Sequence, residues 1–512
     1  MTKSEPKNIA ASAIRGVRWN YLGGISGSLC QLAIGIVLAR ILGPRPFGQV
    51  IIASTIYGFL NLFVDGGFSQ ALIQKPELTS DDVRKTFTCQ AGIGAGMTAL
   101  VCLAAPWIAR QFHDPSAVNV VRAMALMIAI QSTGLVAAAL LRRSMRFRAV
   151  QMAALSSYLI GFLVLGIPMA LSGAGVWSLV TAFLVQAGVN SLLLHIAARH
   201  TMKPLFAWPE RSIATFGVTI IANNVVNWGH ANLDNLAASG LGPAALGLYG
   251  RGCNFAYQPV NTVVNGLQSV LLSSTARVQE RRELMRELTL AVMGLALGVL
   301  GPAYAVLAML PDTTIMGLYG DKWLGVIPLM VPLALAMPLF GVHALLGPIL
   351  CGLGRPELEF WPQALSCVLA AAAFFTAARF SLESVAWALL AVMVVRFAAI
   401  AAFTFHLLKI RWREASALLA GRLLFSAVFG AAVWCVDRGL RVAHVGAAPR
   451  LALEFALSAG LLAWMATAAA PIAFGGRTVR FLLSYGGHLP TWFVARLKRS
   501  AEQPAVGETI CS

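Results

Sequence analysis

Two rows of polar side chains lie within apolar stretches near the middle of the chain. The first row consists of Asn223, Asn227, His230 and Asp234, and the second of Arg251, Asn254, Gln258, Asn261, Asn265 and Gln268. Members of each row recur every three or four residues, which places them on one face of an α-helix. Because polar groups in hydrocarbon are costly without a partner or water, the rows predict either hydrogen bonds between helices or a cavity wall. Their length favours the cavity.

Three charged residues within these and neighbouring apolar stretches are candidates for function. Arg251 can bind an anion through its guanidinium, or it can pair with Asp234 near the turn between the two stretches, as a gate pair that opens when cargo arrives. Asp65 lies late in another apolar stretch. A carboxylate there is either a proton or sodium coupling site, or a helix-end residue that reaches the cytoplasmic interface beside Gly66 and Gly67.

Composition assigns the chain to the class of polytopic membrane proteins. It has 512 residues, of which 58% are hydrophobic and 12% charged, and apolar runs recur from end to end. The eight cysteines are scattered without a CxxC pair, so we expect no metal site, disulfide framework or cofactor. The net charge of +18 reflects Lys and Arg concentrated in alternate connections, which predicts cytoplasmic termini rather than nucleic-acid binding.

The order of apolar segments predicts an all-α fold with about 14 transmembrane helices. We expect two parallel six-helix repeats and two further C-terminal spans, with one early span over 46–73. The predicted organisation is a cytoplasmic segment 1–16, a first repeat 17–200, a cytoplasmic linker 201–211, a second repeat 212–408, two spans within 415–472, and a partly disordered cytoplasmic tail 474–512.

A short motif carries the repeat. Leu42-Gly43-Pro44-x-x-x-Gly48 recurs as Leu241-Gly242-Pro243-x-x-x-Gly247. Glycine favours a left-handed cap at a helix end and proline favours the start of the next helix, so each copy predicts a tight helical hairpin. Two copies in the same orientation imply parallel repeats, as in some transporters. Elsewhere, Gly92-x-x-x-Gly96 predicts close helix packing.

These motifs resemble a known family. The hairpin with Arg40 and Phe47, the stretch from Leu233 to Arg251, Asp65-Gly66-Gly67-Phe68, and Arg143 with Met145-Arg146-Phe147 are similar to the Wzx-type polysaccharide flippases. That family shares a superfamily, called MOP, with the MATE multidrug exporters and the lipid II flippases. The resemblance covers roughly residues 10–410. It implies a V-shaped pair of six-helix lobes around a central cavity, plus two C-terminal helices.

The resemblance also implies a function in the bacterial inner membrane. Such proteins move undecaprenyl-diphosphate-linked oligosaccharide units from the cytoplasmic to the periplasmic leaflet by alternating access, for exopolysaccharide, capsule or O-antigen synthesis. Arg251 then suits the diphosphate. The amides of both rows, with Asn61 and Gln31, suit sugar hydroxyls, while Tyr257 either stacks on a sugar ring or packs within the bundle. Partners would be membrane lipids and, in addition, a polysaccharide polymerase and chain-length or export proteins.

A basic connection could receive the anionic headgroup. Arg142, Arg143 and Arg146 follow the fourth expected span, and such a cluster either binds the headgroup or only sets topology. The rival function is a MATE-like cation-coupled exporter of small molecules, which needs acidic residues to dominate the cavity, whereas amides and an arginine dominate here. A membrane enzyme is disfavoured because no long loop carries a paired-carboxylate or phosphate-binding motif.

Overall fold

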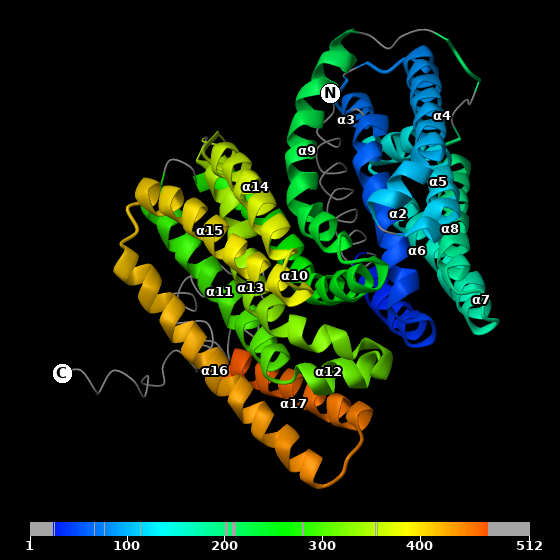
Figure 1. Ribbon diagram of the computed structural model, residues 1–512. Coiled ribbons are helices and arrows are strands. Elements are labelled where there is room, and N and C mark those ends of the chain that lie inside the picture. Colours follow the sequence, from blue (N-terminus) through cyan, green and yellow to red (C-terminus); the bar gives the residue numbers. More distant parts are fainter. Residues whose placement is uncertain are drawn as a thin grey trace. The chain divides into compact units, whose positions relative to one another are not determined.

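The computed structural model describes residues 24, 26–65, 67–75, 77–112, 114–199, 203–206, 211–278, 281–353, 355 and 357–468. These residues are helical without a β-strand, and nine of their helices are long and apolar enough to cross a membrane (Figure 1). Two shorter apolar helices are Ser26–Leu42 and Gln363–Ala377. The expected all-α fold of a multi-pass membrane protein is confirmed. The arrangement of fourteen spans stays a prediction, and segments 1–16 and 474–512 lie outside the described residues.

The chain divides into two units, the first ending at Arg251 and the second beginning at Gly252. After the helix Ser26–Leu42, the first unit contains α2 (Pro44–Asp65), α3 (Phe68–Gln74), α4 (Ser80–Gln111), η1 (Pro115–Ala117), α5 (Val118–Arg143), α6 (Phe147–Tyr158), η2 (Leu159–Gly166), α7 (Ile167–Leu171), α8 (Val176–Ala198), α9 (Arg211–Ser239) and the start of α10 (Pro243–Val278).

The second unit continues along α10. It contains α11 (Arg282–Met309), α12 (Pro311–Leu318), η3 (Asp321–Val326), α13 (Ile327–Gly352), α14 (Glu357–Ala377), α15 (Leu382–Leu408), α16 (Trp412–Val442) and α17 (Ala447–Ala468). The short 3₁₀ turns η1 and η3 precede α5 and α13, respectively. These helices occupy corresponding places in the two sequence repeats.

The division at Arg251 differs from the repeat boundary expected within 201–211. Helix α9 and the start of α10 group with the first unit because they pack against its first two helices. The rings of Phe59 on α2 and Trp228 on α9, for example, lie 4.8 Å apart. The lobe boundaries 17–200 and 212–408 therefore stay a prediction about the sequence repeat. The division by contacts between residues falls instead after Arg251.

Both predicted hairpin turns are present. Gly43 and Gly242 have φ values of 78° and 93°, a left-handed conformation that glycine adopts without strain. Pro44 and Pro243 then begin α2 and α10. Proline suits this place because the first turn of a helix leaves its amide groups without helical partners.

Two sequence expectations about glycines need correction. The span expected over 46–73 is divided into α2 and α3 because Gly67 has a φ of 74°, which interrupts the helix. A Cβ atom on Gly92 or Gly96 would meet nothing within 4 Å, so this pair makes no close helix contact within the part of the chain described. Gly94 between them does, since a Cβ there would lie 2.5 Å from Cβ of Ser132 on α5.

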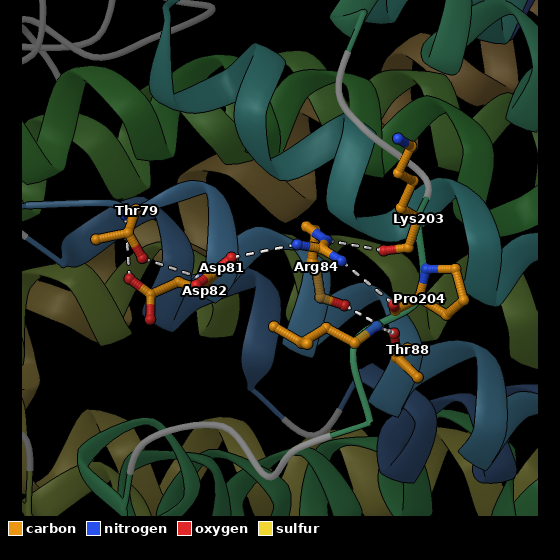
Figure 2. Close-up of polar contacts among 8 residues, drawn as sticks. Thr79, Asp81, Asp82, Arg84, Thr88, Lys203 and Pro204 are labelled. Atoms are coloured by element: carbon orange, nitrogen blue, oxygen red, sulfur yellow. Dashed lines mark hydrogen bonds and ion pairs between the residues drawn. The ribbon is translucent and has the colours of Figure 1, made fainter.

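The described part of the linker, residues 203–206, is tied to the start of α4 (Figure 2). Arg84 donates through Nε to the carbonyl of Lys203 at 3.1 Å and through Nη2 to that of Pro204 at 3.4 Å. The amide of Leu205 donates to Oγ1 of Thr88 at 2.9 Å. These bonds satisfy backbone groups that no regular secondary structure pairs. The linker therefore follows the first unit at this point.

Candidate functional site

The two copies of the hairpin motif pack directly against each other. A Cβ on Gly48 of α2 would overlap the carbonyl oxygen of Pro243, and a Cβ on Gly247 of α10 would overlap that of Pro44. Each glycine thus lies against the proline of the other copy. Only glycine allows two helix backbones to approach this closely. The repeat found in the sequence is therefore expressed as a reciprocal contact between α2 and α10.

Arg251 lies one helical turn beyond this crossing on α10. Its guanidinium carbon is 5.2 Å from the centre of the Phe47 ring, a cation–π arrangement. A Cβ on Gly35, in the helix Ser26–Leu42, would lie 2.7 Å from Nη2 of Arg251. The helix Ser26–Leu42 and α2 therefore both meet α10 at this half-buried cation.

Asp234 is bound by a different partner from the one the sequence offered. Its carboxylate accepts hydrogen bonds from Tyr249 Oη at 3.0 Å and from the amide of Asn235 at 2.8 Å. Both Asp234 and Tyr249 are buried. Among the described contacts Asp234 therefore joins α9 to α10 through Tyr249, while the guanidinium of Arg251 faces Phe47. Asp234 as a gate residue stays a prediction.

The remaining members of the rows differ in exposure along their helices. Exposed members are Asn227, Asn254, Asn261 and Asn265, and half-buried members are His230 and Gln258. Of the other candidates, Gln31 on the first helix is exposed, whereas Tyr257 and Asn61 are half-buried. The side chain of Asn223 lies outside the described residues. Exposed amides in apolar helices fit contact with water or with a polar ligand, since hydrocarbon would leave them unsatisfied.

Tyr257 and Gln268 on α10 contact another helix of the second unit, α13. The ring of Tyr257 packs edge-on against Phe340 on α13, with 5.2 Å between centroids. Gln268 donates to the carbonyl of Ala344 at 2.7 Å. In this conformation both take the packing alternative that the sequence left open.

Asp65 ends α2 beside several other buried oxygen atoms. Its Oδ1 has no hydrogen-bond partner among the described residues, and neither has Oδ1 of Asn61, one turn earlier. Gln90 of α4 donates to the Asp65 carbonyl at 3.5 Å, while its own Oε1 is left without a partner in the described residues. Oxygen atoms of this kind suit a proton or a hard cation. Asp65 as a coupling site stays a prediction.

Two arginines of the predicted headgroup cluster bind helix ends. Arg143 donates through Nη1 to the carbonyls of Leu72, Ile73 and Lys75 at the end of α3. Arg146 donates to the carbonyl of Ala197 at 2.9 Å, at the end of α8. An arginine side chain can donate hydrogen bonds to the last carbonyl groups of a helix, which have no partner within the helix. Its positive charge is also stabilised there by the helix dipole.

The rest of the cluster is open to solvent. Arg142 and Arg148 are exposed, and a surface pocket of about 330 Å³ is lined by Arg146, Arg148, Ala149 and Met152. The cluster thus combines a structural role with an open cationic surface.

Polar contacts with the carboxylate of Asp114 hold the start of α2 in place. Gln49 donates to Oδ2 of Asp114 at 2.6 Å, and the Arg45 guanidinium lies 3.6 Å from Oδ1. Burial favours the neutral acid, but hydrogen bonds from Ser116 and Gln49 and the Arg45 charge outweigh it and hold the pKa of Asp114 below its usual range.

Tyr304 is a residue that the sequence analysis missed. Its hydroxyl donates to the carbonyl of Ala256 and accepts from the amide of Val260, at 3.2 Å for the latter. These two backbone groups flank Pro259 and would otherwise bond to each other along α10. A side chain inserted there is a known cause of helix bending. Pro259 signals the bend in the sequence, but no local pattern identifies its partner on α11.

Charged residues in α16 and α17 were also missed. Asp437 and Arg441 lie four residues apart on α16, and Arg450 and Glu454 lie four residues apart on α17. Both carboxylates are buried, with 1% and 2% of their surface exposed. An acidic residue four positions from an arginine within an apolar helix is the sequence pattern that could have identified these residues.

The helices and their polar faces define the class as a multi-pass α-helical membrane protein. The family model described as polysaccharide biosynthesis protein matches residues 37–328, and the chain belongs to this family. The succinoglycan biosynthesis transport protein ExoT of Rhizobium meliloti (strain 1021) is 26% identical over 354 residues, which cover 69% of this chain and 72% of ExoT.

Solved structures show the same fold. A lipid II flippase, MurJ, in an inward closed conformation matches with a TM-score of 0.69 at 11% identity, over 88% of this chain and 98% of that chain. An inward-facing multidrug resistance MATE family transporter of the MOP superfamily matches with a TM-score of 0.56 at 15% identity, over 78% of this chain and 99% of that one. The family match confirms the expected relation to polysaccharide biosynthesis proteins, and the two solved structures show that the fold is shared.

Proposed function

We propose that this protein is a flippase for undecaprenyl-diphosphate-linked oligosaccharide units in the bacterial inner membrane. It carries them from the cytoplasmic to the periplasmic leaflet by alternating access, with both termini in the cytoplasm. The observation that carries the proposal is the half-buried Arg251, held at the contact of the two hairpin motifs in a family named for polysaccharide biosynthesis. The transport function named for ExoT supports it.

Arg251 is the diphosphate ligand in this proposal. Its guanidinium presents several donors in one plane, which matches the paired oxygens of a phosphate. The Phe47 ring supports one face of the guanidinium, and Gly35 leaves space for its end. These contacts position the guanidinium, and in the proposal the diphosphate binds to it.

The amide-bearing helix faces bind the sugars. Exposed Asn254, Asn261 and Asn265 follow Arg251 along α10, and Asn227 and His230 lie on α9. Amides donate and accept hydrogen bonds at once, which matches hydroxyl groups of varied orientation. Such a surface can bind repeat units of different sugar composition. This suits a transporter that recognises its substrate mainly through the lipid diphosphate.

The arginine cluster after α5 receives the headgroup from the cytoplasmic leaflet. Exposed Arg142 and the pocket beside Arg146 and Arg148 offer positive charge near the membrane surface. Arg143 fixes the end of α3 and so shapes this surface. A polymerase and chain-length or export proteins would take the delivered unit on the other side.

The test is a strain that lacks the gene, complemented with wild type, Arg251→Ala, Arg251→Lys or, as a matched control, the exposed Arg379→Ala. We expect the deletion to trap lipid-linked oligosaccharide in the cytoplasmic leaflet and to abolish surface polysaccharide. Arg379→Ala should restore both, Arg251→Ala neither, and Arg251→Lys only part, because an ammonium cannot bind phosphate bidentately.

An unchanged lipid-linked pool, together with greater sensitivity to small cationic drugs, would overturn the proposal in favour of a MATE-like exporter. Full complementation by Arg251→Ala, at wild-type protein levels, would remove Arg251 from the site while leaving the fold assignment intact.

A further inference from the structure

Asp437 and Glu454 bring two buried carboxyl groups together between α16 and α17. Asp437 lies near the end of α16 and Glu454 near the start of α17, on either side of the turn that joins these helices (Figure 1). Arg450, one helical turn before Glu454 on α17, lies 3.5 Å from Oδ1 of Asp437, which brings the two carboxyl groups close together. Because two carboxylates in contact cannot both remain charged at low cost, such a pair tends to share one proton.

The positive partners of this pair are unequally divided. Asp437 accepts from Nε of Arg441 at 2.6 Å and from Oγ1 of Thr313 at 2.9 Å, and a guanidinium nitrogen of Arg450 lies 3.5 Å from it. Arg441 also donates to Thr313 at 3.0 Å. Oε1 of Glu454, in contrast, has no hydrogen-bond partner in the described part of the chain. The contacts therefore stabilise Asp437 as the ionised member and leave Glu454 as the member that carries a proton.

The charge balance points to the same assignment. The charged groups that face the pair are Arg441, Arg450 and Asp312 of α12, whose carboxylate is 3.8 Å from Arg441. With Glu454 protonated, the two arginines balance Asp437 and Asp312. Loss of the proton would leave one uncompensated negative charge in a buried place, which is costly. A metal cation is a poor occupant, because two guanidinium groups already surround the carboxyls.

We propose that Asp437 and Glu454 form a proton-binding site. Glu454 holds the proton and donates it in a hydrogen bond to Asp437, and release transfers it to water, leaving a Glu454 carboxylate. Exchange with water takes place on the side of Arg441 and Asp312, whose side chains are 34% and 49% exposed. The proposal concerns proton binding alone and does not depend on the cargo proposed above.

The site has the means to link protonation to helix packing. Thr313 joins α12 to Asp437, and Gly317 of α12 packs against Leu451 of α17, where a Cβ would lie 2.9 Å from Cδ2. Release of the proton would place two negative charges against each other across the α16–α17 contact. We therefore expect α17 to separate from α16 when the proton leaves, while α12 keeps its bond to Asp437.

Infrared difference spectroscopy of the purified full-length protein tests the proposal. In the wild type we expect the band of one protonated carboxylic acid, sensitive to exchange into heavy water, that persists at neutral pH and disappears on alkaline titration. Glu454→Gln should lack this band at neutral pH, where ordinary carboxyl groups are ionised. The matched control Glu283→Gln, in a side chain that is 85% exposed, should keep it.

Asp437→Asn provides an independent arm. It removes the negative charge but leaves Arg441 and Arg450, so Glu454 should ionise and the band should be lost at neutral pH although Glu454 is still present. Absence of the band from the neutral wild type would overturn the proposal. So would a band that survives in folded Glu454→Gln or that is unchanged in Asp437→Asn.

Discussion

The crossing of α2 and α10 in the first unit and the α12–α16–α17 cluster in the second show two opposite ways of joining apolar helices. At the crossing, side chains are absent and backbone meets backbone at Gly48 and Gly247. In the cluster, long charged side chains bridge the helices around Asp437. The first contact depends on space and the second on charge balance. Each should therefore fail under a different kind of substitution.

The largest effect should come from adding one carbon at the crossing. In Gly48→Ala the new Cβ would overlap the Pro243 carbonyl, a backbone atom that cannot rotate away. Overpacking of this kind costs on the order of 3 kcal/mol, and we expect loss of most folded protein and of complementation. Gly92→Ala, which adds the same atom in open space, should behave like the wild type. Thermal unfolding of the two purified variants in detergent measures the difference.

Equal stability of Gly48→Ala and Gly92→Ala would contradict the account of the crossing. It would mean that the two helix backbones can move apart without loss, and that close approach is not what the glycines provide.

A comparable but smaller effect is expected in the charged cluster. Asp437→Ala removes the carboxylate that faces Arg441 and Arg450 and leaves both cations in a largely buried place. Removal of one partner of a buried ion pair costs about 3–5 kcal/mol, but Arg441 is partly exposed and Glu454 can take over the negative charge, so we expect a cost below that range. We expect a lower thermal midpoint, and addition of Arg441→Leu in a double variant should recover part of the loss.

The recovery sharpens the comparison. If Asp437→Ala is destabilising only through a cavity, Arg441→Leu will add to the loss instead of offsetting it. Glu283→Ala serves as the control because that side chain is exposed, and its effect should be close to zero.

The smallest effect should be a change in the pH dependence of stability, caused by Asp114, which contacts the start of α2 in the first unit. Because the folded state holds the pKa of Asp114 below its usual range, this group contributes stability above the usual aspartate pKa. The contribution is lost as the pH falls through the lowered folded value. Unfolding measured from neutral to acidic pH should therefore show a smaller acid-induced loss in Asp114→Asn than in the wild type.

The neutral-pH cost of Asp114→Asn should be about 1 kcal/mol. Identical pH profiles for the wild type and Asp114→Asn would show that the contacts with Gln49 and Arg45 do not favour the ionised group. In that case the start of α2 would be held by packing alone, as at the crossing.

The sequence by itself determined the class of fold, because long apolar runs can satisfy their backbone in a membrane only as helices. It also determined the two hairpins, since the Gly-Pro pairs act locally through φ and through the missing amide. Both polar rows were visible for the same reason, because a helix face repeats every three or four residues. Arg251 was found as a row member.

Tertiary structure alone decided which groups meet. That Gly48 lies on Pro243, that Asp234 binds Tyr249, and that Tyr304 enters the backbone beside Pro259 depend on helices far apart in sequence. The glycine pair Gly92 and Gly96 shows the converse, since a pattern typical of close packing faces open space. Spacing fixes which side of a helix a residue occupies, but only the packing of that helix decides what the side faces.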